Sequence, residues 1–554
     1  MSDSQFTINN AALCIVHCAL IASSFFFFAL RSSAQNVAGG TLHGNFELDA
    51  QYYRPDSLIG EPAVPQKMLE NSFVNFIYQN NDFSAGLRYE SYLDPLLGYD
   101  PRYTGSGIAY RYLRFNKDGL DVTAGNFYEQ FGSGLVFRTY QSFALGYDNS
   151  MDGIRVKYNP APGVYLKGVI GNERSFWTEG SGIVRGIDGE ANINQLFKAR
   201  ADKPTNWIVG GSFVSKYQVA QSPTYILPQN VGAGAVRINF TSGGWDIYAE
   251  QAMKANDPSA DNNYIYQNGY ATYFTATYSE PGFGANFGFH RLDNMSFRSD
   301  RAAVTTNLLI NYLPALTKDH TYLLLNIYPY ATQPEGEEGM QGEVFFNLKP
   351  ASPFGGKYGT DITLNFSVIN SINKQVTDTI GDYTSNPFKI GNEVYFQDFN
   401  AEVTKKLSKK VKLIFTYAYV IYNKDVIQGT PGYGIIYSNI AIAELSWKIN
   451  SKKNLRTELQ NLYTKEDQQS WAVLLAELTF VPHWFVAAFD EYNYGNDIAD
   501  QRIHYYTGQL GYTKNTNRIT IGYGRQRAGI LCVGGVCRNV PASDGITLSM
   551  TSSF

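Results

Sequence analysis

Two cysteines near the carboxyl terminus are the clearest candidates for covalent chemistry. Cys532 and Cys537 flank the sequence Val-Gly-Gly-Val, a tight loop that could bring the two sulfur atoms together. In an exported protein this spacing predicts a disulfide that closes a small loop. A metal site is less favoured, because two thiolates with no nearby histidine make a poor zinc ligand set. A redox role is a minor alternative.

The remaining titratable residues form no recognisable catalytic pattern, and we expect no enzymatic activity, cofactor or metal. Beyond residue 34 the histidines are His43, His290, His320, His483 and His504. Alternation along the chain points His290 inward, but no neighbouring nucleophile and base accompany it, so we interpret it as structural. The sequence has no G-x-S-x-G motif, phosphate-binding loop or metalloprotease motif. The acidic segments 257–263 and 335–338 lack the ligand spacing of a Ca²⁺ loop.

One long apolar segment carries isolated charges. Residues 125–140 read GNFYEQFGSGLVFRTY, end a predicted strand and continue into a loop that closes at Ser150. Phe131–Ser150 is either a loop that folds inward as a constriction or docks a partner, or an apolar surface loop that packs on its neighbours. Arg138 and Glu129 are its candidate charges for the constriction.

The elements that must position these residues are strands. From about residue 41 onward, apolar and polar residues alternate over segments of roughly ten residues separated by turn residues, which is the signature of a transmembrane β-barrel. The alternation predicts one lipid-facing and one lumen-facing side. The predicted lumenal charges are Glu47, Asp49, Arg88, Glu90, Lys167, Asp188, Glu190, Asp246, Glu250, Glu444, Lys448 and Arg518. Among these, Arg88, Glu90, Asp246 and Glu250 join Arg138 and Glu129 as candidates for a constriction. Because both signs occur, we expect a wet lumen with no strong charge selectivity.

The connections between these segments alternate in length. Short turns are predicted at residues 80–82, 116–119, 160–163, 241–244, 280–282, 408–410, 451–454, 482–483 and 514–517. Longer loops are predicted at 93–105, 131–150, 172–182, 256–266, 334–339, 371–391 and 425–434, and the Cys532–Cys537 loop joins them on the outside of the cell. Allowing about three further turns, we expect about 26 strands, within a range of about 22 to 30, with short periplasmic turns and long extracellular loops.

The two ends of the chain agree with a barrel. Residues 11–30 form a long apolar run followed by Arg31-Ser-Ser-Ala34-Gln35. We predict a signal peptide over residues 1–34 that is cleaved between Ala34 and Gln35, with a retained membrane anchor as the alternative. At the other end, Ile546, Leu548, Met550 and Phe554 alternate with hydroxylic residues. This pattern resembles the carboxyl-terminal signal that the barrel-insertion machinery reads.

Composition excludes several classes. Only 17% of residues are charged, while Tyr (41), Phe (35) and Gly (51) are abundant. A mean hydropathy of −0.25 argues against a helical membrane protein, and a net charge of −4 argues against nucleic-acid binding. A soluble all-β propeller is the alternative fold, but no blade motif is present.

Two stretches carry a family resemblance. Residues 125–140 and the segment Asn311-Tyr-Leu-Pro-Ala-Leu-Thr-Lys318, which leads to His320-Thr-Tyr322, resemble parts of a family of large Bacteroidetes outer-membrane barrel proteins of unassigned function. The resemblance covers most of the chain after residue 34. It implies a bacterial outer-membrane location and a barrel fold, and it implies no activity.

The combined expectation is an all-β protein in which residues 35–554 form a single large transmembrane antiparallel β-barrel. A passive pore or transport channel for polar solutes is the first functional hypothesis, because a barrel of this size encloses more space than side chains fill. The alternative is a non-transport scaffold in an export or surface-assembly complex. Strands begin within ten residues of Gln35, which leaves no room for the plug domain of a TonB-dependent receptor. The expected partners are outer-membrane lipid, the barrel-assembly machinery and proteins at the extracellular loops, with no nucleic acid.

Overall fold

The computed structural model describes residues 35–554, apart from residues 198–199, 201–202, 220–221, 379–380 and 534–535. The predicted signal peptide, residues 1–34, lies outside the described residues. Gln35 opens the short strand β1 (Gln35–Val37), which pairs with the next strand and stands outside the ring.

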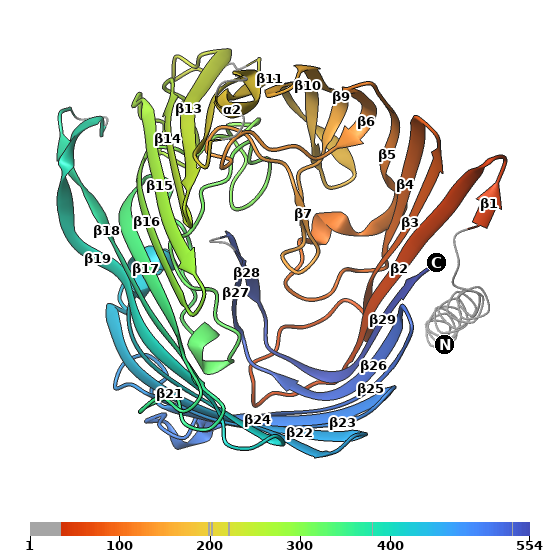
Figure 1. Ribbon diagram of the computed structural model, residues 1–554, viewed down its shortest axis with the longest axis vertical. Helices are drawn as coiled ribbons and strands as arrows, with labels where there is room; N and C mark the ends of the chain where they lie inside the picture. Colours follow the sequence, from red (N-terminus) through yellow and green to blue (C-terminus); the bar gives the residue numbers. More distant parts are fainter. Residues whose placement is uncertain (1–34, 198–199, 201–202, 220–221, 379–380, 534–535) are drawn as a thin grey trace, which may run out of the picture.

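The chain forms a closed antiparallel barrel of 24 strands, in which each strand pairs with its neighbours in chain order (Figure 1). The strands of the ring are β2 (Gly40–Tyr53), β3 (Met68–Asn80), β4 (Phe83–Tyr92), β5 (Gly105–Lys117), β6 (Leu120–Phe127), β9 (Met151–Ala161), β10 (Val164–Ser175), β11 (Thr178–Asn192), β12 (Asn206–Tyr217), β13 (Asn230–Ser242), β14 (Trp245–Lys254), β15 (Gly269–Glu280), β16 (Phe283–Asp293), β17 (Gly336–Leu348), β18 (Thr360–Val376), β19 (Tyr383–Lys406), β20 (Val411–Asn423), β21 (Ile435–Asn450), β22 (Lys453–Tyr463), β23 (Trp471–Phe480), β24 (Trp484–Tyr492), β25 (His504–Lys514), β26 (Asn517–Gln526) and β29 (Ser543–Ser553).

The other elements are short and lie in connections. They are the helices α2 (Ile193–Leu196) and α3 (Lys424–Ile427), the 3₁₀ turns η1 (Pro101–Tyr103), η3 (Leu324–Asn326) and η4 (Ala499–Gln501), and the strand pairs β7 (Gln141–Ser142) with β8 (Tyr147–Asp148) and β27 (Gly529–Val533) with β28 (Val536–Val540). Within the described ranges, none of the helices has the length and apolar character needed to cross a bilayer.

Alternation along each strand separates the two faces of the wall as predicted. Across the β2–β29 pair, Leu48 lies opposite Met550 on the outer face, and Gln51 lies opposite Thr547 on the inner face. Large apolar side chains on the outer face are open to the surroundings, including Leu113 at 67% and Leu459 at 61% exposure. A strand with this period-two pattern presents an apolar band to lipid.

Every short turn predicted from the sequence joins two neighbouring strands at one end of the barrel, which we call the short-turn end. Two more connections at this end, 193–205 and 349–359, are longer than tight turns and were not found from the sequence. The expectation of about 26 strands allowed for about three further turns, whereas the described chain has these two, and the ring has 24 strands.

Three of the predicted long loops are wrong in extent. Residues 172–182 belong mainly to β10 and β11, which are joined by a two-residue turn at Phe176 and Trp177. Their glycines suggest a loop, but a Cβ on Gly180 would lie 2.9 Å from Leu308, and one on Gly182 would lie 2.0 Å from the Ser299 carbonyl oxygen. These glycines make room for another segment rather than for a turn.

The predicted loop 371–391 is also mostly strand, because β18 and β19 run on past the barrel rim as a long hairpin (Figure 1). The predicted loop 334–339 lies at the end of a much longer connection, residues 294–335, that the sequence did not reveal.

The carboxyl-terminal residue closes the barrel seam. The backbone amides of Gly44 and Phe554 each donate to the other residue's carbonyl, at 2.9 and 3.0 Å, and the Phe554 ring lies 6.0 Å from that of Phe76. Deleting Phe554 removes both hydrogen bonds, each contributing about 1 kcal/mol. We expect a smaller folded, heat-modifiable fraction on gels of membrane extracts. Phe554→Tyr, which keeps the ring and the backbone, should match the native chain, and an undiminished folded fraction after the deletion would contradict this role.

Candidate functional site

Three connections at the end opposite the short turns fold back into the barrel: residues 128–150, residues 294–335 and the β27–β28 hairpin. We call them together the plug. Figure 1 shows β7 and the β27–β28 hairpin inside the ring of strands. The first two segments hydrogen-bond to each other: the Arg138 amide donates to the Ile310 carbonyl at 2.8 Å, and the Asn311 side chain donates to the Leu135 carbonyl at 3.0 Å.

An apolar interface holds the first segment against the wall. Phe131, Leu135 and Phe137 are fully buried and pack in one cluster with Phe297 and Ile310 of the second segment. Most wall residues of this cluster are small or branched: Val169, Val184, Val214, Val231, Ala233, Ala235, Ala252, Ala271 and Leu292. Phe127 and Met151, at the ends of β6 and β9, are the larger ones. Burying a Leu or Phe side chain contributes about 1.5–3 kcal/mol, so this part of the plug is a packed core. Of the two interpretations of Phe131–Ser150, the structure shows the loop folded inward.

Buried ion pairs connect the same segment to β4 and β10. Arg88 contacts both Glu90, at 2.7 Å, and Asp148. Arg174 contacts Glu90 at 2.7 Å and Asp148 at 2.8 Å. Burial raises the pKa of the Asp148 carboxyl, but the charges of Arg88 and Arg174, together with hydrogen bonds to the carboxylate, hold that pKa below its ordinary value. The charges of the two arginines and of the two carboxylates, Glu90 and Asp148, therefore cancel. Arg88 and Glu90 therefore lie on the lumenal side, beneath the plug.

Two other candidate residues also hold the plug. Glu129 contacts Lys157 at 2.6 Å and Lys167 at 3.2 Å. Glu250 on β14 accepts hydrogen bonds from the Ser133 amide at 2.9 Å and from the Ser133 hydroxyl at 2.5 Å.

The last two candidates lie apart from these anchors. Arg138 is held between the rings of Tyr140 and Tyr312, at 4.7 and 4.0 Å from their centroids. Asp246 is exposed near the short-turn end, where Asn239 donates to it at 2.7 Å.

The second plug segment follows the inside of the wall from β11 to β23. Lys216 and Lys254, both fully buried, donate to the Arg298 and Ser296 carbonyls at 2.7 and 2.6 Å. Further along, Leu324 and Tyr328 pack against apolar residues of β18–β23. The motif at 311–322 lies in this segment, with His320 2.8 Å from Asp398. Alternation alone could not show this packing, because the motif lies between strands.

His290 is a lumenal histidine that makes buried polar contacts. His290 faces the lumen as predicted, where its ring contacts the Glu337 carboxylate at 2.7 Å and the Pro314 carbonyl at 3.1 Å. In the part of the chain that the structure describes, no three His, Cys, Asp or Glu side chains are placed to share a metal ion.

The predicted disulfide is present, but the hairpin that carries it lies inside the barrel, which the sequence did not predict. Cys532 and Cys537 face each other across β27–β28 and form a disulfide. The expectation that this loop faces the outside of the cell is wrong, because the hairpin turns back into the lumen. Cys537 there contacts the Tyr330 carbonyl at 3.8 Å, and Arg538 donates to the Ala144 carbonyl at 2.7 Å. The order of the strands fixes the end at which a loop emerges but not the direction in which it folds.

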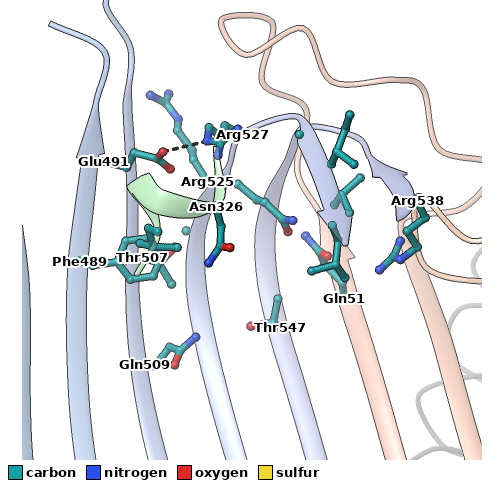
Figure 2. Close-up of a pocket in the computed structure, with 17 residues that line it drawn as sticks. Gln51, Asn326, Phe489, Glu491, Thr507, Gln509, Arg525, Arg527, Arg538 and Thr547 are labelled. Carbon is teal, nitrogen blue, oxygen red and sulfur yellow. Dashed lines mark hydrogen bonds and ion pairs between the residues drawn. The ribbon is translucent and has the colours of Figure 1, made fainter. Parts of the chain in front are cut away.

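A cavity of about 430 Å³ remains between the hairpin, η3 and the wall formed by β24–β26, β29 and β2 (Figure 2). The wall contributes mostly polar side chains: Gln51, Phe489, Glu491, Thr507, Gln509, Arg525, Gln526 and Thr547. The plug contributes mostly apolar ones, such as Leu323, Ile530 and Leu531, together with Asn326 and Arg538. Within the lining, Glu491 forms an ion pair with Arg527, and Arg525 forms one with Asp56, which lies outside the lining.

A comparison with protein families identifies the chain's relatives. The family of unknown function DUF6029 matches residues 11–554. The chain belongs to this family. A search of curated proteins finds no match for this DUF6029 member.

Solved structures with a similar barrel include receptors and a pore. A ferric enterobactin receptor (PfeA) mutant from Pseudomonas aeruginosa matches with a TM-score of 0.41 and 10% identity over 93% of this chain and 80% of that chain. The siderophore receptor PirA from Acinetobacter baumannii matches with a TM-score of 0.42 and 11% identity over 94% and 81%. The usher PapC translocation pore matches with a TM-score of 0.38 and 9% identity over 93% and 99%.

The ion pairs around Asp148 predict how the plug can be loosened. Asp148→Asn leaves Arg88 and Arg174 with Glu90 as their shared carboxylate, and breaking a buried pair costs about 3–5 kcal/mol. Arg138 is the one trypsin site within residues 128–150. We expect trypsin to cleave the folded variant there at least about tenfold faster than the native chain.

Asp82→Asn is the matched control, because Asp82 pairs with Lys117 at the protein surface, 3.3 Å away. A surface pair contributes about 0–1 kcal/mol, so this variant should resist trypsin as the native chain does. Equal resistance of the Asp148 variant would show that the ion pairs do not hold the plug.

Proposed function

We propose that the protein is an outer-membrane transport channel whose lumen, narrowed by its own loops, admits a small polar solute. The observation that carries the proposal is the cavity of Figure 2, which lies inside the barrel and is bounded by polar side chains of the wall. Alternation places most of these side chains inward, on five adjoining strands, so the lumen is lined by polar groups on this side and filled by the plug on the other. A water-accessible lumen lined by mixed polar groups is what passage of a polar solute requires.

The proposed location follows from the outer surface of the ring. Large apolar side chains stand exposed there, and the barrel closes on itself, so each of the strands of the ring is paired on both edges. We place the short-turn end and both termini in the periplasm and the plug end outside, in the outer membrane of a bacterium such as the Bacteroidetes that the sequence resembles. The carboxyl-terminal strand, β29, would be recognised by the barrel-assembly machinery. The chain would have no enzymatic role, because the histidine and acidic side chains described above are engaged in structural contacts.

Cysteine labelling inside the cavity tests the channel. Gln509 on β25 lines the cavity, whereas its neighbour Leu510 points out of the barrel. In a planar bilayer, a water-soluble methanethiosulfonate reagent should lower the conductance of Gln509→Cys by roughly half or more, because the adduct occupies the narrowed lumen.

Leu510→Cys is the matched control and should conduct unchanged after the same treatment. Cys532 and Cys537 do not interfere, because they are joined in the disulfide. The other two cysteines, Cys14 and Cys18, lie in the predicted signal peptide and are left out of a chain expressed from Gln35. A native chain that inserts and folds but never conducts, or a conductance indifferent to the Gln509 adduct, would contradict the channel.

A scaffold in a surface-assembly complex is the second candidate, and the β18–β19 hairpin favours it. This hairpin extends past the rim, and its far part carries Phe388 at 96% and Val376 at 70% exposure. Exposed apolar groups of this kind mark protein contacts. Under this function, Phe388→Asp would shift the protein to a smaller species on native gels of solubilised outer membranes, while conductance is unaffected.

A further inference from the structure

The cavity of Figure 2 carries an uneven set of charges. Three arginines line it, Arg525 from β26, Arg527 just after β26 and Arg538 from β28, against the single carboxylate of Glu491. They come from the wall and from the plug, so the cavity has cationic groups on opposite sides (Figure 2).

Two of the three arginines are already neutralised. Arg525 lies 2.6 Å from Asp56, and Arg527 lies 2.8 Å from Glu491. These pairs join β26 and the segment after it to neighbouring parts of the rim, and they leave little charge for a solute.

Arg538 differs from both. Among the described residues, no carboxylate lies within ion-pair distance of its guanidinium. Its Nε donates to the Ala144 carbonyl at 2.7 Å, and the group lies over the Tyr99 ring at 4.4 Å from the centroid. One terminal nitrogen, Nη1, is buried and has no hydrogen-bond partner in the described chain. A buried guanidinium N–H without a partner is costly, so such groups are normally satisfied by an acceptor.

The rest of the cavity lining offers donors, and its one carboxylate, Glu491, is already paired with Arg527. Gln51 and Gln509 present side-chain amides to the cavity, and Thr507 and Thr547 present hydroxyls. The disulfide at Cys537, the residue before Arg538, fixes the strand that carries the guanidinium. A planar, preorganised guanidinium is well matched to a carboxylate or phosphate, which it can bind through two parallel hydrogen bonds.

We propose that this cavity binds a small anion bearing a carboxylate or phosphate group, with the Arg538 guanidinium as its ion-pair partner. The proposal deepens the channel function proposed above, since it names the class of solute, and it rests on the cavity being the solute's site. Anion binding does not require conduction, so the anion site and the channel function can be tested, and can fail, separately.

Calorimetric titration of the purified chain in detergent tests the binding step. Citrate serves as the carboxylate probe and inorganic phosphate as the phosphate probe. We expect at least one to bind, and we expect Arg538→Gln to weaken that binding at least about tenfold, because a charge-assisted contact is lost. Arg538→Lys keeps the positive charge but loses the planar guanidinium and its two parallel hydrogen bonds. This variant should bind the probe with intermediate affinity.

Arg54→Gln is the matched control, because Arg54 lies at the same end of the barrel but on its outside, where it donates to the Tyr523 hydroxyl at 2.6 Å. It should bind the probe as the native chain does. Heat modifiability and an intact disulfide establish that the Arg538 variants fold. Should neither probe bind the native chain, or should folded Arg538→Gln bind as tightly as the native chain, the proposal is overturned.

Conductance separates this inference from the function on which it rests. A native chain that binds citrate or phosphate through Arg538 but never conducts would leave the anion site standing and overturn the channel. A chain that conducts, selects cations over anions under a salt gradient and binds neither probe would keep the channel and overturn the anion site.

Discussion

A closed ring of 24 strands encloses a large lumen, and the connections between the strands determine how that lumen is filled. Each added strand widens the barrel, and at this size the wall's own side chains no longer reach across the lumen. The space must hold water or more protein. Here the connections 128–150 and 294–335 fill much of it, and their packing accounts for features of the wall that are unusual for a water-filled barrel. Val169, Val184 and Val214 face inward because they meet buried aromatic rings of the plug rather than solvent.

Charge pairing gives this internal core its orientation. Apolar packing is non-directional, whereas the contacts of Asp148 with Arg88 and Arg174 can form in only one register of the loop on the wall. Replacing such buried networks by apolar residues is often neutral for stability. We therefore assign these pairs to fixing where the plug lies, with the burial of Phe131 and Phe137 supplying most of the free energy.

The same internal packing explains what the sequence could and could not predict. Strand faces and short turns are local properties, so alternation such as Phe83 to Glu90 and turn residues such as Asn81-Asp82 were sufficient. Strand β11 was not predicted correctly because part of its inward face, around Val184 and Gly186, is apolar. Val184 and Gly186 face the plug, and a Cβ on Gly186 would lie 2.8 Å from the Phe131 ring. The alternation of polar inward residues therefore disappears where the apolar cluster of the plug covers the wall.

For the candidate site, too, alternation predicted the local features but not the contacts between distant parts of the chain. Alternation placed Arg88, Glu90 and Glu250 on the lumenal face correctly, but it could not show that the plug covers them, because that depends on contacts between residues far apart in the chain. Ser133 and Glu250, for example, are separated by 117 positions. Arg538 was not singled out at all. It follows a cysteine in a segment whose composition suggests an external loop, and only the inward fold of that segment brings it to the cavity.

The position of the hairpin links the disulfide to the cavity. β27 and β28 pair with each other and not with the barrel wall, so contacts such as those of Cys537 with Tyr330 and of Arg538 with Ala144 hold the hairpin in the lumen. The disulfide keeps the two strands in register, so the hairpin has a fixed shape even though it has no sheet neighbour. Because Arg538 supplies both a hairpin contact and the unpaired guanidinium, an anion in the cavity acts on the same side chain that holds the hairpin. A ligand shifts an equilibrium only by its difference in affinity for the two states, and an anion that requires the guanidinium in this place favours the inward position of the hairpin.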